Sequence, residues 1–166
     1  MASPEIRVGT GYDAHAFAPE GTERSLILGG VEVPHTRGLA GHSDADVLIH
    51  AIVDALLGAA GEGDIGTHFP STDTRWKDAT STAFLTYTVD LLTQRGWTIG
   101  NIDATVVAER PKLAPHIVTI RTQLARLTGV SPDRISVKGK TTDHLGFTGR
   151  EEGIACHAVA LIMRQQ

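Results

Sequence analysis

The segment Gly41–Leu57, GHSDADVLIHAIVDALL, restricts the possible folds of this 166-residue chain more than any other stretch. It is apolar nearly all round, which predicts a buried helix, and the capping-box spacing of Ser43 and Asp46 predicts a start at about Ser43. Asp46, His50 and Asp54 recur every four residues and therefore share one face of that helix. A buried polar row needs partners, because an unpaired charge or imidazole in apolar surroundings costs several kcal/mol. A metal ion on His50 would provide one, and so would a hydrogen bond to Asp46 or Asp54.

A second polar pair, Asp13 and His15, follows the strand predicted over Ile6–Thr10. Two residues apart in extended backbone, these side chains point to the same side. A carboxylate and an imidazole placed together form half of a divalent-metal site, and His50 would be the third ligand. Asp-x-His is also a common hydrogen-bonded pair, so the spacing alone leaves both interpretations open.

The chain has one cysteine, Cys156, which excludes an internal disulfide framework and a cysteine-rich zinc site. Any metal must therefore use histidines and carboxylates, and a reducing compartment is expected. The N-terminus MASPEIRVG lacks a signal pattern, and no apolar run approaches the roughly 18 residues of a membrane span. A net charge of −4 with dispersed signs argues against a nucleic-acid partner. We expect a cytoplasmic protein that binds neither membranes nor nucleic acid.

Hydrophobic periodicity and turn residues predict the remaining elements. In chain order they are a hairpin over Ser25–Pro34 beside the first strand, an irregular loop over Asp64–Pro70, a helix over Thr80–Arg95, a strand over Ile102–Ala108, a helix over Leu113–Leu127, and strands over Ile135–Thr142 and Ile154–Met163. Repeats and linkers are missing from the sequence, so residues 1–166 are predicted to form one catalytic domain. This order favours an α/β sandwich with a mixed sheet of about four strands and helices on one face. The other face needs a cover, for which a second copy of the chain is expected.

Glycine-rich phosphate loops, dinucleotide fingerprints and nucleophile elbows do not occur in the sequence. The polar residues at predicted strand and helix ends are instead rich in metal ligands and phosphate partners, which suits phosphoryl transfer. They are Asp13, His15, His42, Ser43, His50, Asp64, Lys112, Lys140, Thr141, Thr142, Asp143 and Arg150.

Seven segments, in order GYDAHAF, LILGG, GHSDADVLIHAIVDALLGA, GDIGTHFP, ERPKLAPH, KTTD and LGFTGREEGIAC, resemble the 2-C-methyl-D-erythritol 2,4-cyclodiphosphate synthases of the non-mevalonate isoprenoid pathway. They cover nearly the whole chain. The resemblance implies a homotrimer with active sites between neighbouring subunits. It also implies a phosphorus–oxygen lyase that closes 4-diphosphocytidyl-2-C-methyl-D-erythritol 2-phosphate to the cyclodiphosphate and releases CMP.

The resemblance also implies roles for single residues. Asp13, His15 and His50 match the family's zinc ligands. His42 and Thr141 match residues that stabilise charge in the transition state, and they are the expected catalytic residues. Asp143, where many members have glutamate, is the expected ligand of a second divalent ion, Mg²⁺ or Mn²⁺. The full set of expected substrate-binding residues is Asp13, His15, His42, Ser43, Asp64, Ile65, Gly66, Phe69, Asp73, Ala108, Pro111, Lys112, Leu113, Ala114, Lys140, Thr141, Thr142, Asp143, Phe147 and Arg150.

Within that set, the run Ala108–Ala114 resembles the cytidine-binding segment and Asp64–Gly66 the part that holds the erythritol hydroxyls. Phe147 and Arg150 correspond to positions near the trimer axis, where an isoprenoid diphosphate could bind in a central cavity. Ser71 and Lys140 depart from the residues common in the family.

Two other functions use the same residues. A zinc hydrolase would hold water on the three ligands, although no HExxH-like helix supplies a base beside it. A binding protein for nucleotides or isoprenoid diphosphates would keep the trimer and the pocket but would not need zinc.

Overall fold

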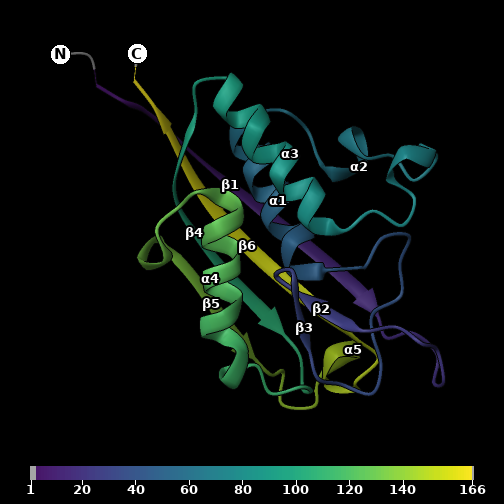
Figure 1. Cartoon of the computed structure of the whole chain (residues 1–166). Coiled ribbons are helices and arrows are strands. Elements are labelled where there is room, and N and C mark those ends of the chain that lie inside the picture. Colours follow the sequence, from purple (N-terminus) through teal and green to yellow (C-terminus); the bar gives the residue numbers. More distant parts are fainter. Residues whose placement is uncertain (1–2, 166) are drawn as a thin grey trace.

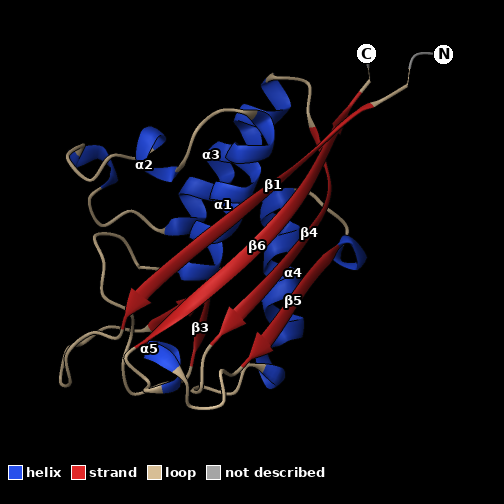
Figure 2. Cartoon of the chain, turned by 180° about the vertical axis from the view of Figure 1, so that it is seen from behind, coloured by secondary structure: helices blue, strands red, loops and turns tan. Residues whose placement is uncertain are grey.

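The computed structural model describes residues 3–165 and confirms a mixed four-stranded sheet with its long helices packed on one face (Figure 1). The strand order is β1-β6-β4-β5, with antiparallel pairs β1–β6 and β6–β4 and a parallel pair β4–β5. Figure 2 shows the sheet from its open side, with the long helices behind it. The strands are β1 (Glu5–Ala16), β4 (Thr98–Val107), β5 (Ile135–Lys140) and β6 (Gly153–Arg164).

Three long helices, two short helices and a hairpin complete the described part of the chain. The helices are α1 (Val47–Ala60), α2 (Ile65–His68), α3 (Ser81–Gln94), α4 (Ile117–Thr128) and α5 (Gly146–Gly149), and the hairpin is formed by β2 (Leu26–Leu28) and β3 (Val31–Val33). Single 3₁₀ turns lie at Thr74–Trp76, Ala114–His116 and Pro132–Arg134.

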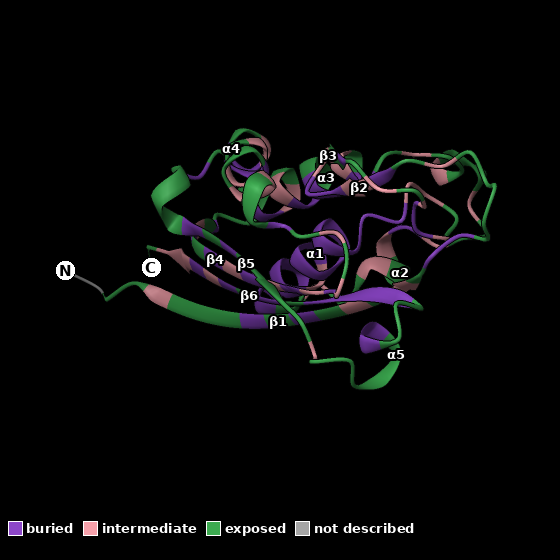
Figure 3. Cartoon of the chain, turned by 90° about the horizontal axis from the view of Figure 1, so that it is seen from below, coloured by how far each residue is buried: buried purple, intermediate pink, exposed green. Residues whose placement is uncertain are grey.

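Helix α1 is the centre of the fold, because the sheet covers one of its sides while α3 and the hairpin cover the other (Figure 3). Only Asp54 and Gly58 of its residues are not buried, as the all-round apolar sequence predicts. Gly9 and Gly11 of β1 let the helix backbone approach the sheet very closely. A Cβ atom on Gly11 would lie 1.9 Å from the carbonyl oxygen of Ala51. These contacts hold α1 against the middle of β1.

The predicted start of α1 at Ser43 is wrong, since the helix begins at Val47 with Asp46 as its N-cap. Ala45 has a φ of 54°, a left-handed conformation that an α-helix cannot contain. The Asp46 carboxylate accepts a hydrogen bond from the Ile49 N–H at 3.0 Å. Asp46 therefore caps the helix by itself instead of completing a capping box with Ser43.

The hairpin turns at Gly29-Gly30 as predicted, both with positive φ, but it does not lie beside the first strand. It lies in the helix layer against α1 and α4 (Figure 3). The buried Asp46 carboxylate holds the hairpin in this layer, because the carboxylate accepts hydrogen bonds from the N–H groups of Gly29 at 2.9 Å and Gly30 at 2.7 Å. One side chain thus joins the turn to the start of α1.

Asp46→Ala is expected to lower the free energy of unfolding by at least about 3 kcal/mol, because it leaves three N–H groups without their acceptor in or beside the core. Urea unfolding at a fixed protein concentration measures this. Asp90→Ala, at an exposed position on α3, is the control and should change stability by less than about 0.5 kcal/mol. A loss below about 1 kcal/mol for Asp46→Ala would contradict the shared-acceptor role.

Several other predicted boundaries move. Strand β1 runs to Ala16, not Thr10, because every residue from Glu5 pairs with β6. The predicted irregular loop over Asp64–Pro70 contains the short helix α2, whose first turn is capped by the Asp64 carboxylate on the Thr67 N–H at 2.8 Å. The strand predicted to reach Thr142 ends at Lys140.

The open face of the sheet carries apolar side chains along β1 and β6. Ile6, Val8 and Tyr12 are 57%, 62% and 51% exposed, and Val159 is also exposed. This is the face for which the sequence predicts a partner copy. Within residues 3–165, none of the helices has both the length and the hydropathy needed to cross a membrane.

Candidate active site

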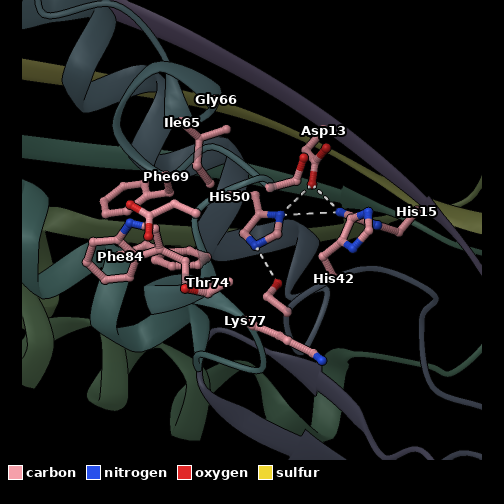
Figure 4. Close-up of a pocket in the computed structure, with 14 residues that line it drawn as sticks. Asp13, His15, His42, His50, Ile65, Gly66, Phe69, Thr74, Lys77 and Phe84 are labelled. Carbon is pink, nitrogen blue, oxygen red and sulfur yellow. Dashed lines mark hydrogen bonds and ion pairs between the residues drawn. The ribbon is translucent and has the colours of Figure 1, made fainter.

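Asp13, His15 and His50 meet at one point, where the end of β1 lies against α1 (Figure 4). Asp13 Oδ2 lies 2.9 Å from His15 Nε2 and 3.1 Å from His50 Nδ1, and the two ring nitrogens are 3.2 Å apart. Ligand atoms of a tetrahedral zinc ion with bonds of about 2.0 Å are about 3.3 Å from one another. The three groups therefore have the chemistry and the spacing to hold a metal ion.

Hydrogen bonds behind both rings set which nitrogen faces the site. His15 Nδ1 donates to the Ala40 carbonyl at 2.8 Å, which leaves Nε2 facing Asp13. When protonated, Nε2 donates to the Asp13 carboxylate; when deprotonated, it offers its lone pair to a metal ion. The Ser81 hydroxyl donates to the Asp44 carboxylate and therefore accepts from His50 Nε2, at 2.9 Å. His50 Nδ1 is therefore the nitrogen that faces Asp13, where it is placed to bind a metal ion.

The predicted orienting partners of His50, Asp46 or Asp54, are wrong. Asp46 is used as the N-cap of α1, and the Asp54 carboxylate accepts the Ile65 N–H at 2.8 Å. Both carboxylates bind backbone amides of a neighbouring segment, and Ser81 of α3 takes the role expected of them. Ser81 follows His50 by 31 residues, a separation that no helical period connects, so the sequence contained no signal for it.

The charges and hydrogen bonds within the triad of Asp13, His15 and His50 favour a charged Asp13. Burial of Asp13 opposes ionisation, but hydrogen bonds from His15 and His50 outweigh it and hold the pKa of the carboxyl well below its usual range. For His15, burial lowers the pKa, whereas the hydrogen bond and the charge of Asp13 raise it, and the net direction is upward. Asp13 therefore brings a full negative charge to any cation held there.

A cavity of about 350 Å³ opens beside the triad (Figure 4). It brings together nine residues that the sequence singled out: Asp13, His15, His42, Ser43, His50, Ile65, Gly66, Phe69 and Asp73. Ser71 also lines it. One wall is aromatic, since Phe69 stacks on Phe84 at 4.5 Å and meets Trp76 edge-on at 4.8 Å between ring centroids.

Four lining residues were missed, namely Thr74, Trp76, Lys77 and Phe84. Phe84 belongs to the predicted helix Thr80–Arg95, whose apolar face indicated packing only. Phe84 does pack against its neighbours, but it does so at the wall of the cavity. Lys77 is the positive charge of this cavity. It lies in an irregular segment between α2 and α3, where neither periodicity nor a motif marked it.

A second depression, of about 330 Å³, lies where the parallel strands β4 and β5 end. It brings together another seven predicted residues: Ala108, Pro111, Lys112, Leu113, Ala114, Lys140 and Thr141. Glu109, Ile117 and Gly139 complete its lining. The two groups of predicted site residues thus line two different cavities of one chain.

Five predicted residues line neither cavity. Asp64 caps α2, and the Thr142 hydroxyl donates to the Leu145 carbonyl at 2.5 Å. Asp143 is exposed and has a φ of 53°. The exposed Arg150 forms an ion pair with Glu152 at 2.9 Å, and Phe147 is also exposed.

Comparison with known proteins gives consistent results. Residues 6–163 match the model of the YgbB family. A Pseudomonas aeruginosa protein named 2-C-methyl-D-erythritol 2,4-cyclodiphosphate synthase is 56% identical over 158 residues, covering 95% of this chain and 99% of that protein. A protein of the same name from Ralstonia pickettii is 56% identical over 162 residues, which are 98% of this chain and 95% of the relative.

Solved structures agree. The CDP complex of IspF from Plasmodium falciparum superposes with a TM-score of 0.84 at 37% identity, covering 97% of each chain. The bifunctional IspDF of Campylobacter jejuni gives a TM-score of 0.92 at 40% identity, covering 99% of this chain but 44% of that longer one. The family resemblance seen in the sequence is confirmed over nearly its full length: this chain belongs to the YgbB family, that of the 2-C-methyl-D-erythritol 2,4-cyclodiphosphate synthases.

Proposed function

We propose that this chain converts 4-diphosphocytidyl-2-C-methyl-D-erythritol 2-phosphate to 2-C-methyl-D-erythritol 2,4-cyclodiphosphate and CMP. A 2-phosphate oxygen forms a bond to the β-phosphorus, and the bond from that phosphorus to the oxygen bridging to CMP breaks, with its electron pair leaving on CMP. The observation that carries this proposal is the convergence of Asp13, His15 and His50 on one wall of a cavity that also holds His42 and Ser43. The names of the relatives support it.

The first part of the proposed site binds zinc and the phosphate groups. Zinc bound by Asp13, His15 and His50 would act as a Lewis acid on a phosphate oxygen. His42 and Ser43 line the same cavity and are proposed to hold the reacting phosphate. Such positioning and charge neutralisation account for most of the catalysis in phosphoryl transfer.

Lys77, which the sequence did not single out, adds a positive charge to the cavity of His42 and Ser43. It is opposite in sign to the phosphates that the site must hold. The neighbouring residues Asp64, Ile65, Gly66, Phe69 and Asp73 are proposed to contact the erythritol unit.

The second part of the proposed site binds the nucleotide at the ends of β4 and β5. The run Ala108–Ala114 is proposed to bind the cytidine, with Lys112 and Lys140 near phosphate. Thr141 is proposed to orient the diphosphate, and Asp143 would hold a second divalent ion, Mg²⁺ or Mn²⁺, that would neutralise phosphate charge.

We further propose a homotrimer in which the sheets face a common axis, so that the triad cavity of one subunit adjoins the nucleotide cavity of its neighbour. The exposed apolar face along β1 and β6 supports this assembly, as does the separation of the two cavities within one chain. Phe147 and Arg150 are proposed to lie near that axis, where Arg150 could meet an anionic isoprenoid diphosphate.

Sedimentation velocity at several protein concentrations is expected to give a single species of three times the chain mass of 17.6 kDa. Val8→Glu, which places a charge on the apolar sheet face, should shift the protein toward smaller species. A wild-type monomer with full activity would contradict both the trimer and the shared site.

Asp143→Asn is expected to lower kcat by at least about tenfold, corresponding to roughly 1.4 kcal/mol of transition-state stabilisation, because it removes a charge that binds the second ion. Initial rates of CMP release at varied Mg²⁺ or Mn²⁺ measure this, and high metal concentrations should restore part of the rate. Asp143→Glu should stay active. Normal turnover of Asp143→Asn at limiting metal would remove Asp143 from the ion site.

The reaction itself is tested by incubating the zinc-loaded protein with the cytidylyl substrate and identifying the products by ³¹P NMR. Formation of cyclic diphosphate with an equal amount of CMP supports the proposal. A linear hydrolysis product would instead indicate a zinc hydrolase, and unchanged substrate would indicate a binding protein.

A further inference from the structure

One buried carboxylate joins the ends of β4 and β5 at the second cavity. Glu109 follows the end of β4, and its side chain is only 8% exposed. Its Oε1 atom accepts the N–H of Thr142 at 3.1 Å and the N–H of His144 at 3.2 Å. These two amides lie on either side of Asp143. Glu109 therefore binds the backbone of the loop that carries Asp143.

The Thr141–His144 loop contains two consecutive residues with positive φ. Asp143 and His144 have φ values of 53° and 65°, a left-handed region that is uncommon for residues other than glycine, although aspartate and histidine enter it more readily than most. Such conformations persist where surrounding contacts determine them. The Thr142 hydroxyl, bonded to the Leu145 carbonyl and 3.1 Å from the Thr148 hydroxyl, supplies one such contact. Glu109 supplies two.

The contact between Glu109 and the loop lies beside the cavity at the ends of β4 and β5. The Ala108 N–H also donates to the Lys140 carbonyl at 2.9 Å, so the segments after β4 and β5 run side by side. Glu109 extends that connection from the proposed nucleotide segment to the loop that carries Thr141 and Asp143.

We propose that Glu109 is a positioning residue, whose carboxylate holds the Thr141–His144 loop at the distance from the nucleotide segment that the reaction requires. This inference rests on the proposed function, because that function assigns the roles of Thr141 and Asp143. Glu109 acts through the two backbone amides. A neutral side chain with an oxygen at the same place should therefore replace it, whereas a shorter side chain should not.

The test compares Glu109→Gln, Glu109→Ala and Glu109→Asp in the full chain, using CMP release at varied Mg²⁺. Glu109→Ala is expected to lower kcat by about tenfold or more, since small misplacements of reacting groups are costly. It should also raise the Mg²⁺ concentration for half-maximal rate by about tenfold, as loss of groups that orient a metal ligand does. Zinc content should not change, because the zinc ligands lie on β1 and α1.

Glu109→Gln should stay within about threefold of wild type in kcat and in the Mg²⁺ concentration for half-maximal rate, because its amide oxygen can accept both N–H groups. Glu20→Ala, at an exposed glutamate in the turn before β2, is the matched control and should behave as wild type. Wild-type kinetics in Glu109→Ala would overturn the proposal. A Gln variant as impaired as the Ala variant would overturn it too, since the charge and not the backbone contact would then matter.

Amide hydrogen exchange at Thr142 and His144 tests the contact without substrate. Exchange should be at least about tenfold faster in Glu109→Ala than in wild type or Glu109→Gln, because the lost hydrogen bonds no longer protect these amides. Equal protection would overturn the proposal. If Glu109→Ala does not fold, Glu109→Asp, one methylene shorter, should show the same pattern. If wild type releases no CMP, the proposed function fails, while the exchange data still decide whether Glu109 holds the loop.

Discussion

His50→Ala is expected to purify without zinc and to lose at least about a thousandfold in kcat, which corresponds to roughly 4 kcal/mol. Two protein ligands, Asp13 and His15, remain in this variant, and two do not hold the tetrahedral ion that three hold. Metal analysis by mass spectrometry after extensive dialysis measures the zinc content, and CMP release measures the rate.

The control for this variant is His35→Ala, which removes a histidine that does not line the triad cavity. Its zinc content should equal that of wild type. A thermal melt of both variants separates metal loss from unfolding. Undiminished zinc in folded His50→Ala would remove His50 from the proposed metal site.

Gly11→Ala is expected to lower the free energy of unfolding by at least about 3 kcal/mol, at the upper end of the usual cost of overpacking. The added methyl group would sit 1.9 Å from the Ala51 carbonyl oxygen, and backbone atoms of a buried helix cannot swing aside as a long side chain can. Helix α1 must therefore move away from β1, which also separates His50 from Asp13. Urea unfolding and zinc titration are expected to show both losses together.

Gly58→Ala is the matched control, because a Cβ atom there would come no closer than 3.9 Å to any neighbour. In an α-helix this substitution should be neutral or stabilising by up to about 1 kcal/mol. If Gly11→Ala were as stable as Gly58→Ala, the close approach of α1 to β1 would be wrong.

The elements that show themselves in the pattern of neighbouring residues could be predicted from the sequence. The all-round apolar run of α1 indicated a central helix, and the two-residue spacing of Asp13 and His15 in a strand indicated a shared side; the structure confirms both. The four-stranded sheet with helices on one face followed from the element order. The substrate contacts inferred from the family resemblance stay predictions.

What could not be predicted depends on contacts between distant segments. The start of α1 depends on the left-handed backbone of Ala45 and on Asp46, whose carboxylate also binds the amides of Gly29 and Gly30. The partner of His50 is Ser81, on a helix whose position no local pattern specifies. Polar side chains were thus recognised as important, while their partners were assigned from sequence neighbours that the fold places elsewhere.

The strand order has a consequence for how the chain folds as it is made. Strand β6, the last described strand in the chain, lies between β1 and β4, and it pairs Glu5 with Arg164 and Ala16 with Gly153. Until β6 has been synthesised, β1 has no neighbour among the described strands. Closing so long a loop is slow and entropically costly, and it must wait until β6 has emerged from the ribosome. The sheet surface that packs against α1, formed by β1 with Gly9 and Gly11 and by β6, is therefore completed late. Until then the apolar surface of α1 needs protection from aggregation during translation.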